Sequence, residues 1–156
     1  LFTQMNDFGV SDGLTILGAS GTVTAQNINA IGAAAEGFIT GVGYSVLIDS
    51  PENKAFTEAF RERNGADPDL YGADSYGLLF AYKAAVEAAG ATDTDSVRAA
   101  LEGLSWETPQ GTKTIRAGDH QAMQPMYVVE VKNGQFTIAR SIAGEDAIGP
   151  DTCDKF

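Results

Sequence analysis

Residues 50–65 read SPENKAFTEAFRERNG, and this stretch is the clearest structural signal in the chain. A serine at position 50 can accept a hydrogen bond from the first turn of a helix, and Pro51 has the φ that the first helical position needs. Apolar residues then recur at helical spacing, and Gly65 stands where a left-handed C-terminal cap is expected. The stretch therefore predicts a helix that begins at Pro51 and ends near Gly65.

Strands and helices alternate before this helix, and two further helices follow it. The elements expected upstream are a buried strand at 14–17, a helix at 25–35 and a β-rich stretch at 38–48. Those expected downstream are helices at about 73–89 and 95–101, a strand at 112–116, and a hairpin of 126–131 and 135–139 around Asn133-Gly134. This order predicts an α/β fold with mainly parallel sheets. We expect the three helices to cover a sheet whose strands lie mostly outside this chain.

The composition excludes several classes of function. The chain has 156 residues and a net charge of −11, with one histidine and one cysteine. Such an acidic chain repels a phosphate backbone, which excludes nucleic acid as a partner. One histidine and one cysteine are too few for a zinc site within the chain, and the carboxylates lack EF-hand spacing. No apolar run reaches the ~18 residues that cross a bilayer.

The first third of the chain carries very little charge. Residues 1–48 contain no Lys or Arg and only three acids, which are Asp7, Asp12 and Glu36. Leu1, Met5 and Phe8 share one helical face, and nothing ahead of Leu1 can cap that helix. We therefore expect a fragment, or one half of a nicked protein, in which a missing partner segment covers part of residues 1–48.

A glycine-containing loop follows the first expected strand. Its sequence is Ile16-Leu17-Gly18-Ala19-Ser20-Gly21-Thr22-Val23. Three interpretations are open: a plain strand-to-helix turn, the phosphate-binding loop of a dinucleotide enzyme, or a loop that binds another small polar ligand. The dinucleotide interpretation lacks its third small residue, because Thr24 stands there, and the nearest suitable acid, Asp49, comes late. The small-ligand interpretation uses Ser20, Thr22 and the backbone N–H groups.

Other reactive residue types have structural explanations, and we predict no catalytic residue, metal or cofactor. Cys153 lies in a tail, and the chain has no Gly-x-Ser-x-Gly elbow. His120 is expected to be a loop residue that is hydrogen-bonded to nearby backbone. Acids that flank helix starts suit the positive end of the helix dipole: Asp67, Asp69, Asp93 and Asp95. Aromatic residues expected in the core or at its boundary are Tyr71, Tyr76, Phe80 and Tyr82.

Short motifs occur in a fixed order between residues 14 and 139. They are Ala35-Glu36-Gly37-Phe38, Ser50-Pro51-Glu52-Asn53-Lys54-Ala55-Phe56, Asp67-Pro68, Asp74-Ser75-Tyr76, Ala88-Ala89-Gly90-Ala91-Thr92-Asp93, Thr108-Pro109-Gln110-Gly111, Arg116-Ala117-Gly118-Asp119-His120-Gln121 and Met126-Tyr127-Val128-Val129. Together they resemble the C-terminal half of type I periplasmic solute-binding proteins for branched-chain amino acids and amides. The resemblance implies a two-lobe α/β fold whose N-terminal half is missing. It places 1–46 and 118–139 in the second lobe, 47–117 in the first, and 140–156 in a tail.

The resemblance implies capture of a solute, not catalysis. The chain would belong to the periplasmic binding component of an ABC uptake system, with a signal peptide outside the given residues. Its partners would be a membrane permease, the missing N-terminal portion, and a small polar solute such as an amino acid, amide, urea-like compound or carboxylate. A sensory receptor or regulator of the same fold is the alternative, and a dinucleotide enzyme ranks third.

We expect the loop of Ala19, Ser20, Gly21 and Thr22 to form one wall of the ligand cleft, because α/β sheets place ligands where a strand ends before a helix. Gly18 and Gly21 would let backbone donors approach the ligand without a Cβ atom in the way. Ser20 stands where the amino-acid-binding relatives carry an acid for the ammonium group of the ligand. A hydroxyl cannot neutralise an ammonium, so an amide, urea-like solute or carboxylate is favoured over a zwitterion. In an oxidising compartment, the odd Cys153 either pairs outside this chain or is a free thiol.

Overall fold

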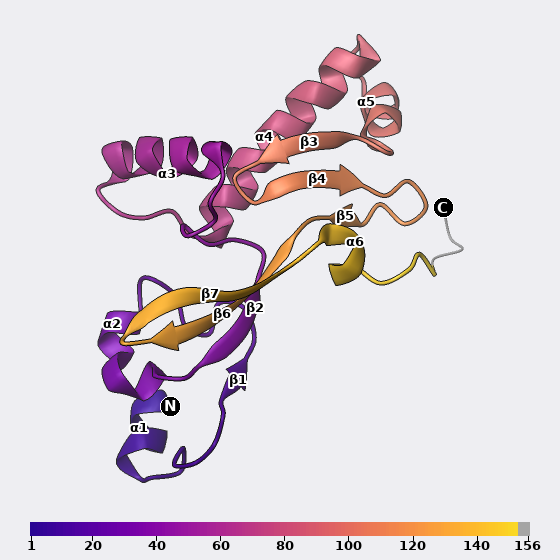
Figure 1. Ribbon diagram of the computed structural model, residues 1–156. Coiled ribbons are helices and arrows are strands. Elements are labelled where there is room, and N and C mark those ends of the chain that lie inside the picture. The colour runs from indigo at the N-terminus through magenta and orange to yellow at the C-terminus, as the bar shows by residue number, and fades with distance from the viewer. Residues whose placement is uncertain (153–156) are drawn as a thin grey trace. The chain divides into compact units, whose positions relative to one another are not determined.

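The computed structural model describes residues 1–152, which divide into two compact units (Figure 1). The sheet unit comprises Leu1–Val42 and Tyr127–Ser141, and the helical unit comprises Gly43–Met126 and the described residues from Ile142 to residue 152. The chain thus passes between the units three times. The assignment of these units to the lobes of a larger protein stays a prediction.

The sheet unit is built on four strands in the order β1-β2-β6-β7. They are β1 (Leu17–Gly18), β2 (Ile39–Val42), β6 (Met126–Lys132) and β7 (Gln135–Ile142). β1 and β2 pair in parallel, whereas β2 and β6 pair antiparallel. β6 and β7 form the predicted hairpin, in which Asn133 and Gly134 have φ values of 54° and 72°. Among the described residues, parallel pairing is therefore limited to β1 with β2, because a hairpin connection pairs its strands antiparallel.

A small apolar core holds the sheet unit together. Its buried members are Val23, Ile28, Ala35, Phe38 and Val131. Phe2 of α1 (Phe2–Asp7) packs edge-on against Phe38, with ring centroids 5.4 Å apart. Helix, loop and strand are thus fixed to one another through a buried phenylalanine.

Three boundaries in the first 50 residues differ from the expected ones. The first strand begins at Leu17 and not at residue 14. The helix expected at 25–35 is split into α2 (Ile28–Ile31) and the 3-10 helix η1 (Gly32–Ala35), because Gly32 has φ 63° and interrupts the α-helix. β2 ends at Val42, and the carbonyls of Ser45, Val46 and Ile48, in the stretch expected to be β-rich, bond to the side chain of Asn53.

The helical unit opens on α3 (Pro51–Asn64), which confirms the helix expected from the opening motif. The Ser50 Oγ atom accepts a hydrogen bond from the Asn53 N–H at 3.1 Å. At the other end, Gly65 has φ 67° and donates its N–H to the Arg61 carbonyl. Both predicted caps are therefore present.

The two helices that follow each begin after an aspartate. α4 (Leu70–Ala89) starts where the Asp69 carboxylate accepts the Gly72 N–H at 2.9 Å, which moves its start ahead of the expected residue 73. α5 (Thr94–Leu101) starts where Asp93 accepts the Ser96 N–H at 3.0 Å. The capping role predicted for these two acids is confirmed.

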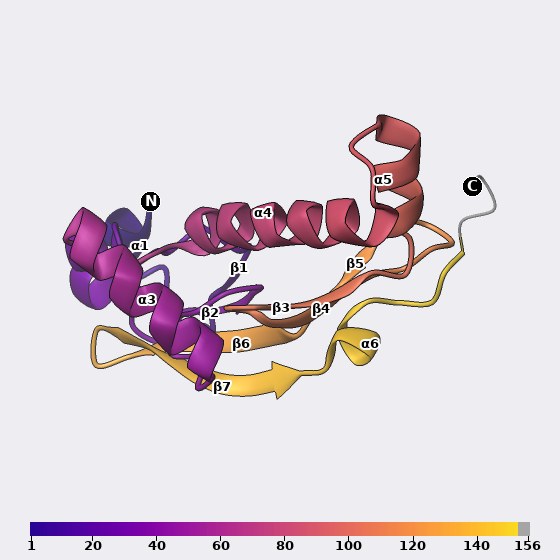
Figure 2. The ribbon, with the colours of Figure 1, turned by 90° about the horizontal axis from the view of Figure 1, so that it is seen from above.

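A three-stranded antiparallel sheet packs with α4 in the helical unit (Figure 2). Its strands are β3 (Ser105–Thr108), β4 (Gly111–Ile115) and β5 (Ala122–Met123). Because β5 pairs with β4, residues 118–125, which precede β6, belong to the helical unit. The residues expected to form a tail include one helical turn, α6 (Gly144–Ala147).

The two faces of α4 differ sharply in side-chain size. The buried face is a stripe of small residues, Ala73, Gly77, Ala81 and Ala85. The Trp106 indole N–H of β3 donates to the Gly77 carbonyl at 3.0 Å, an approach that a small residue permits. Six of the large apolar residues of α4 are 41–74% exposed: Tyr71, Tyr76, Leu78, Leu79, Phe80 and Tyr82. Packing at the core boundary is confirmed for Tyr76 and Phe80, whose ring centroids are 4.8 Å apart, and Tyr76 also contacts Phe56. For Tyr71 and Tyr82, which are 74% and 53% exposed, the expectation is wrong in this chain.

Candidate functional site

The predicted ligand-binding residues form one tight turn at the end of β1. The Thr22 N–H donates to the Ala19 carbonyl at 3.2 Å, and Gly21 has φ 85°, the value that a type II turn requires at its third residue. Ala19, Ser20, Gly21 and Thr22 are all exposed. The structure thus brings all four together and leaves the hydroxyl groups of Ser20 and Thr22 open to solvent.

Gly18, just before the turn, has a packing role. A Cβ atom built at this position would lie 2.5 Å from two ring carbons of Phe38, which is 1% exposed. We expected Gly18 to let backbone donors approach a ligand. Its contacts show instead that it lets β1 pack closely on the buried phenylalanine, so the end of β1 is fixed.

Asn27 is hydrogen-bonded to the C-terminal end of the turn, a role that was not predicted from the sequence. Its side-chain oxygen accepts the Thr24 N–H at 2.7 Å, and its amide nitrogen donates to the Thr22 carbonyl at 3.2 Å. An asparagine beside a helix start is the only sequence signal for this role, and it normally indicates a cap for the helix itself.

No carboxylate belongs to the turn itself. Glu36, the one acid in the expected motif Ala35-Glu36-Gly37-Phe38, accepts the N–H groups of Asn133 and Gly134 at 2.9 and 3.1 Å. It therefore caps the β6–β7 turn. A ligand at residues 19–22 would meet hydroxyl groups and backbone amides, which bind carboxylate, amide or hydroxyl groups.

The turn lacks the features of a dinucleotide site. Such a site places a phosphate at the N-terminus of a helix that follows the glycine loop directly. Here α2 begins at Ile28, well after the turn, and is four residues long. Asp49, the acid considered for a ribose, forms an ion pair with Lys54 in the helical unit. The geometry therefore removes the basis of that interpretation.

The remaining candidate residues do not assemble a reactive site. His120 lies in a turn with φ 57°, its N–H bonded to the Arg116 carbonyl and its Nε2 atom 3.2 Å from a Glu102 carboxylate oxygen. Its expected role as a loop residue bonded to nearby backbone is confirmed. Cys153 lies outside the described residues. Residues 1–152 contain no cluster of three His, Cys, Asp or Glu side chains that could hold a metal ion, and none of their helices has the length and apolar character to span a bilayer.

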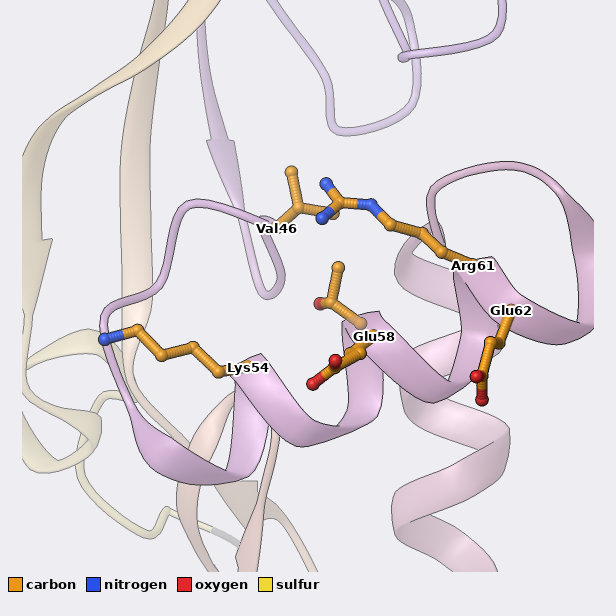
Figure 3. A pocket seen from close by; sticks show the side chains of 6 residues that line it. Val46, Lys54, Glu58, Arg61 and Glu62 are labelled. Atoms are coloured by element: carbon orange, nitrogen blue, oxygen red, sulfur yellow. The ribbon is translucent and has the colours of Figure 1, made fainter.

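An open hollow lies on the surface of α3 (Figure 3). It is lined by Val46, Lys54, Thr57, Glu58, Arg61 and Glu62. Two cations and two acids contribute to the lining, and both cations have partners of their own, since Lys54 pairs with Asp49 and Arg61 with Asp67. Figure 3 shows that the charged ends point in different directions. We assign no ligand to this hollow.

Residues 1–135 match the family described as periplasmic binding proteins. Among curated proteins, the chain is 35% identical over 109 residues to Leu/Ile/Val-binding protein homolog 4 of Brucella abortus (strain 2308), which covers 67% of this chain and 26% of that protein. It is 28% identical over 124 residues to Leu/Ile/Val-binding protein homolog 6 of the same organism, which covers 78% of this chain and 32% of that protein. The chain therefore spans no more than about a third of either relative.

Solved structures of solute-binding proteins share the fold. The leucine-, isoleucine-, valine-, threonine- and alanine-binding protein of Brucella ovis, in its closed conformation, has a TM-score of 0.83 and 25% identity over 96% of this chain and 41% of its own. A solute-binding protein of an ABC transporter from Rhodopseudomonas palustris BisB5, in complex with 3,4-dihydroxybenzoic acid, has a TM-score of 0.80 and 26% identity over 93% of this chain and 42% of its own. Both are named as binding proteins for small solutes.

Proposed function

Because the chain belongs to the periplasmic binding protein family, we propose that it forms part of a periplasmic protein that captures a small polar solute for an ABC transporter. Membership of the family confirms the resemblance carried by the motifs. The permease partner, the secreted location and the solute are parts of this proposal. The proposal concerns the whole protein, because the chain spans only about two fifths of the length of these structural neighbours.

One observation carries the proposal for the binding residues. The turn of residues 19–22 follows the carboxyl end of a strand, which is where α/β sheets bind ligands, and its hydroxyl groups are exposed. Its two ends are fixed, by Gly18 against Phe38 and by Asn27 on the other side. A polar, exposed turn whose two ends are held by such contacts is suited to forming one wall of a solute site.

The chemistry of the turn favours a solute without an ammonium group. The turn has no carboxylate to neutralise a positive charge, and the carboxylate of Glu36 is engaged at the β6–β7 turn. The relatives are named for branched-chain amino acids, and one structural neighbour holds 3,4-dihydroxybenzoic acid. We propose that the solute of this protein resembles the second of these, with a carboxylate or amide group facing Ser20.

Calorimetric titration of the whole protein tests this choice, with 3,4-dihydroxybenzoate and leucine as probes. We expect 3,4-dihydroxybenzoate to bind at least about tenfold more tightly, a difference of about 1.4 kcal/mol. Ser20→Glu should weaken that binding and strengthen binding of leucine, because the new carboxylate repels an anion and attracts an ammonium group. Ala25→Glu, which changes an exposed residue outside the turn, is the matched control. Tighter binding of leucine by the unmodified protein would contradict the proposed solute class.

We also propose that the missing N-terminal portion covers the exposed face of α4. Leu78 and Leu79 are 68% and 70% exposed in this chain. Complete folded proteins rarely leave so much apolar surface of one helix exposed to solvent. In the whole protein, Leu79→Ala should then lower the free energy of unfolding by about 2–5 kcal/mol. Ser75→Ala, at an exposed polar position of α4, should change it by less than about 0.5 kcal/mol. Equal, small effects in thermal or urea unfolding would show that this face stays uncovered.

A further inference from the structure

We propose that Asn27 is a positioning residue, which holds the turn of residues 19–22 in one conformation before the solute arrives. The inference rests on the proposed function, because the part that this turn plays in binding belongs to that proposal. Asn27 occupies the N-cap position of α2, where an asparagine side chain ordinarily accepts a hydrogen bond from its own helix. It makes no such bond here.

The side chain of Asn27 is turned back onto the segment that precedes the helix. Its oxygen accepts the Thr24 N–H at 2.7 Å, and its nitrogen donates to the Thr22 carbonyl at 3.2 Å. The acceptor and donor of one amide group are thus used on residues that flank Val23. The α2 helix therefore has no side-chain cap, and Asn27 makes two hydrogen bonds to the end of the turn and the residues just after it.

The turn lies between two residues that are held by packing, so the two Asn27 hydrogen bonds act on a short segment whose ends are fixed. Val23 is 4% exposed and belongs to the core of the sheet unit. On the other side, Gly18 pairs with Thr40 of β2 and packs on Phe38. The turn lies between these anchors, and the Thr22 carbonyl that Asn27 binds belongs to its last residue. Loss of the Asn27 amide would free that residue while both anchors stay in place.

A turn that is already ordered binds more tightly than one that must become ordered on binding. The turn itself has one internal backbone bond, from the Thr22 N–H to the Ala19 carbonyl, and four exposed residues. Without Asn27, that single bond would have to keep the turn in one conformation, although water can compete for the same exposed backbone groups. We therefore assign to Asn27 the rigidity of the turn and a share of the solute affinity, with no direct contact to the solute.

The first test measures the mobility of the turn in the whole protein without solute. Asn27→Ala should lower the NMR order parameters of the residue 20–22 amides from about 0.85 to below about 0.6. The Thr24 amide should also lose protection from hydrogen exchange in Asn27→Ala. It should keep that protection in Asn27→Asp, which retains the acceptor oxygen. Asn29→Ala, at an exposed asparagine two residues along the same helix, should change neither quantity.

The second test measures affinity by titration with 3,4-dihydroxybenzoate. Asn27→Ala should weaken binding about threefold to tenfold, the usual effect of losing one or two neutral hydrogen bonds, and Asn29→Ala should leave it unchanged. A turn that stays rigid in Asn27→Ala overturns the inference, and so does a mobile turn with unchanged affinity. If the unmodified protein binds neither 3,4-dihydroxybenzoate nor leucine, the proposed solute class fails, and the order parameters still decide whether Asn27 fixes the turn.

Discussion

Two connections in this chain follow strands of the same sheet and lead into helices, yet they treat their polar groups in opposite ways. The turn after β1 is exposed and is braced from outside by Asn27. The segment after β2 is bound by Asn53, which is 1% exposed and donates to the carbonyls of Ser45, Val46 and Ile48 at 3.3, 3.2 and 2.9 Å. Asn27 therefore leaves the turn exposed to solvent, whereas Asn53 occupies three backbone carbonyl groups of its segment.

A buried polar network extends from Asn53. Its side-chain oxygen accepts the Thr57 hydroxyl at 3.3 Å, and the Thr57 Oγ and Tyr44 hydroxyl oxygen atoms are also 3.3 Å apart. Burial raises the pKa of Tyr44, so its hydroxyl stays neutral and can serve the network. The comparison shows that an asparagine at the start of a helix can either bury the polar groups of the preceding segment or hold that segment while it stays exposed.

The largest expected effect is on the segment after β2. Asn53→Ala should lower the free energy of unfolding by about 3 kcal/mol, because it leaves buried carbonyl groups without their donor. Asn64→Ala, at an exposed asparagine near the end of the same helix, should cost less than about 0.5 kcal/mol. Urea unfolding of both variants checks this. A cost for Asn53→Ala no greater than that of the control would mean that the network does not fix the segment.

A smaller effect is expected at the base of the turn. Gly18→Ala should destabilise the protein by about 1–3 kcal/mol, because its Cβ atom would overlap the ring of buried Phe38. Gly41→Ala is the matched control, since a Cβ atom at that position of β2 has no neighbour within 4 Å. Thermal unfolding should separate the two variants. If both melt together, the turn is not anchored through Gly18.

The smallest expected effect on folding is at the turn itself. Ser20→Ala should change the free energy of unfolding by less than about 0.5 kcal/mol, because the side chain is exposed. It should weaken solute binding by about 0.5–1.5 kcal/mol if the hydroxyl meets a neutral group, and by up to about 3 kcal/mol if it meets a charged one. Calorimetry paired with thermal unfolding measures both quantities. An unchanged affinity would place the solute elsewhere.

The sequence predicts features that depend on neighbouring residues in the chain. Ser50, Pro51 and Gly65 act within a single helix, so the bounds of α3 follow from local chemistry. Asn133-Gly134 predicts its hairpin for the same reason, since both residues accept positive φ. The four residues of the candidate turn are found in this way too, because a strand followed by a glycine-containing loop is a local pattern.

Features that depend on tertiary packing escape sequence analysis. The aromatic residues of α4 have the spacing of core residues. The sequence does not show that α4 packs on the rest of this chain through its small residues and leaves the aromatic residues exposed. Gly32 fits a helix interior by pattern, and only the folded backbone gives it the positive φ that splits α2 from η1. Asn27 resembles an ordinary cap in the sequence, and only the folded structure shows that its side chain bonds to Thr22 and Thr24 and not to its own helix.

The central claim is that the exposed turn after β1 forms a wall of the solute site. A crystal structure of the whole protein with 3,4-dihydroxybenzoate bound tests it most directly. We predict a carboxylate or hydroxyl oxygen of the solute within about 3.2 Å of the Ser20 hydroxyl or of a backbone N–H of residues 19–22. A solute held entirely by other residues, with this turn still open to solvent, would contradict the claim.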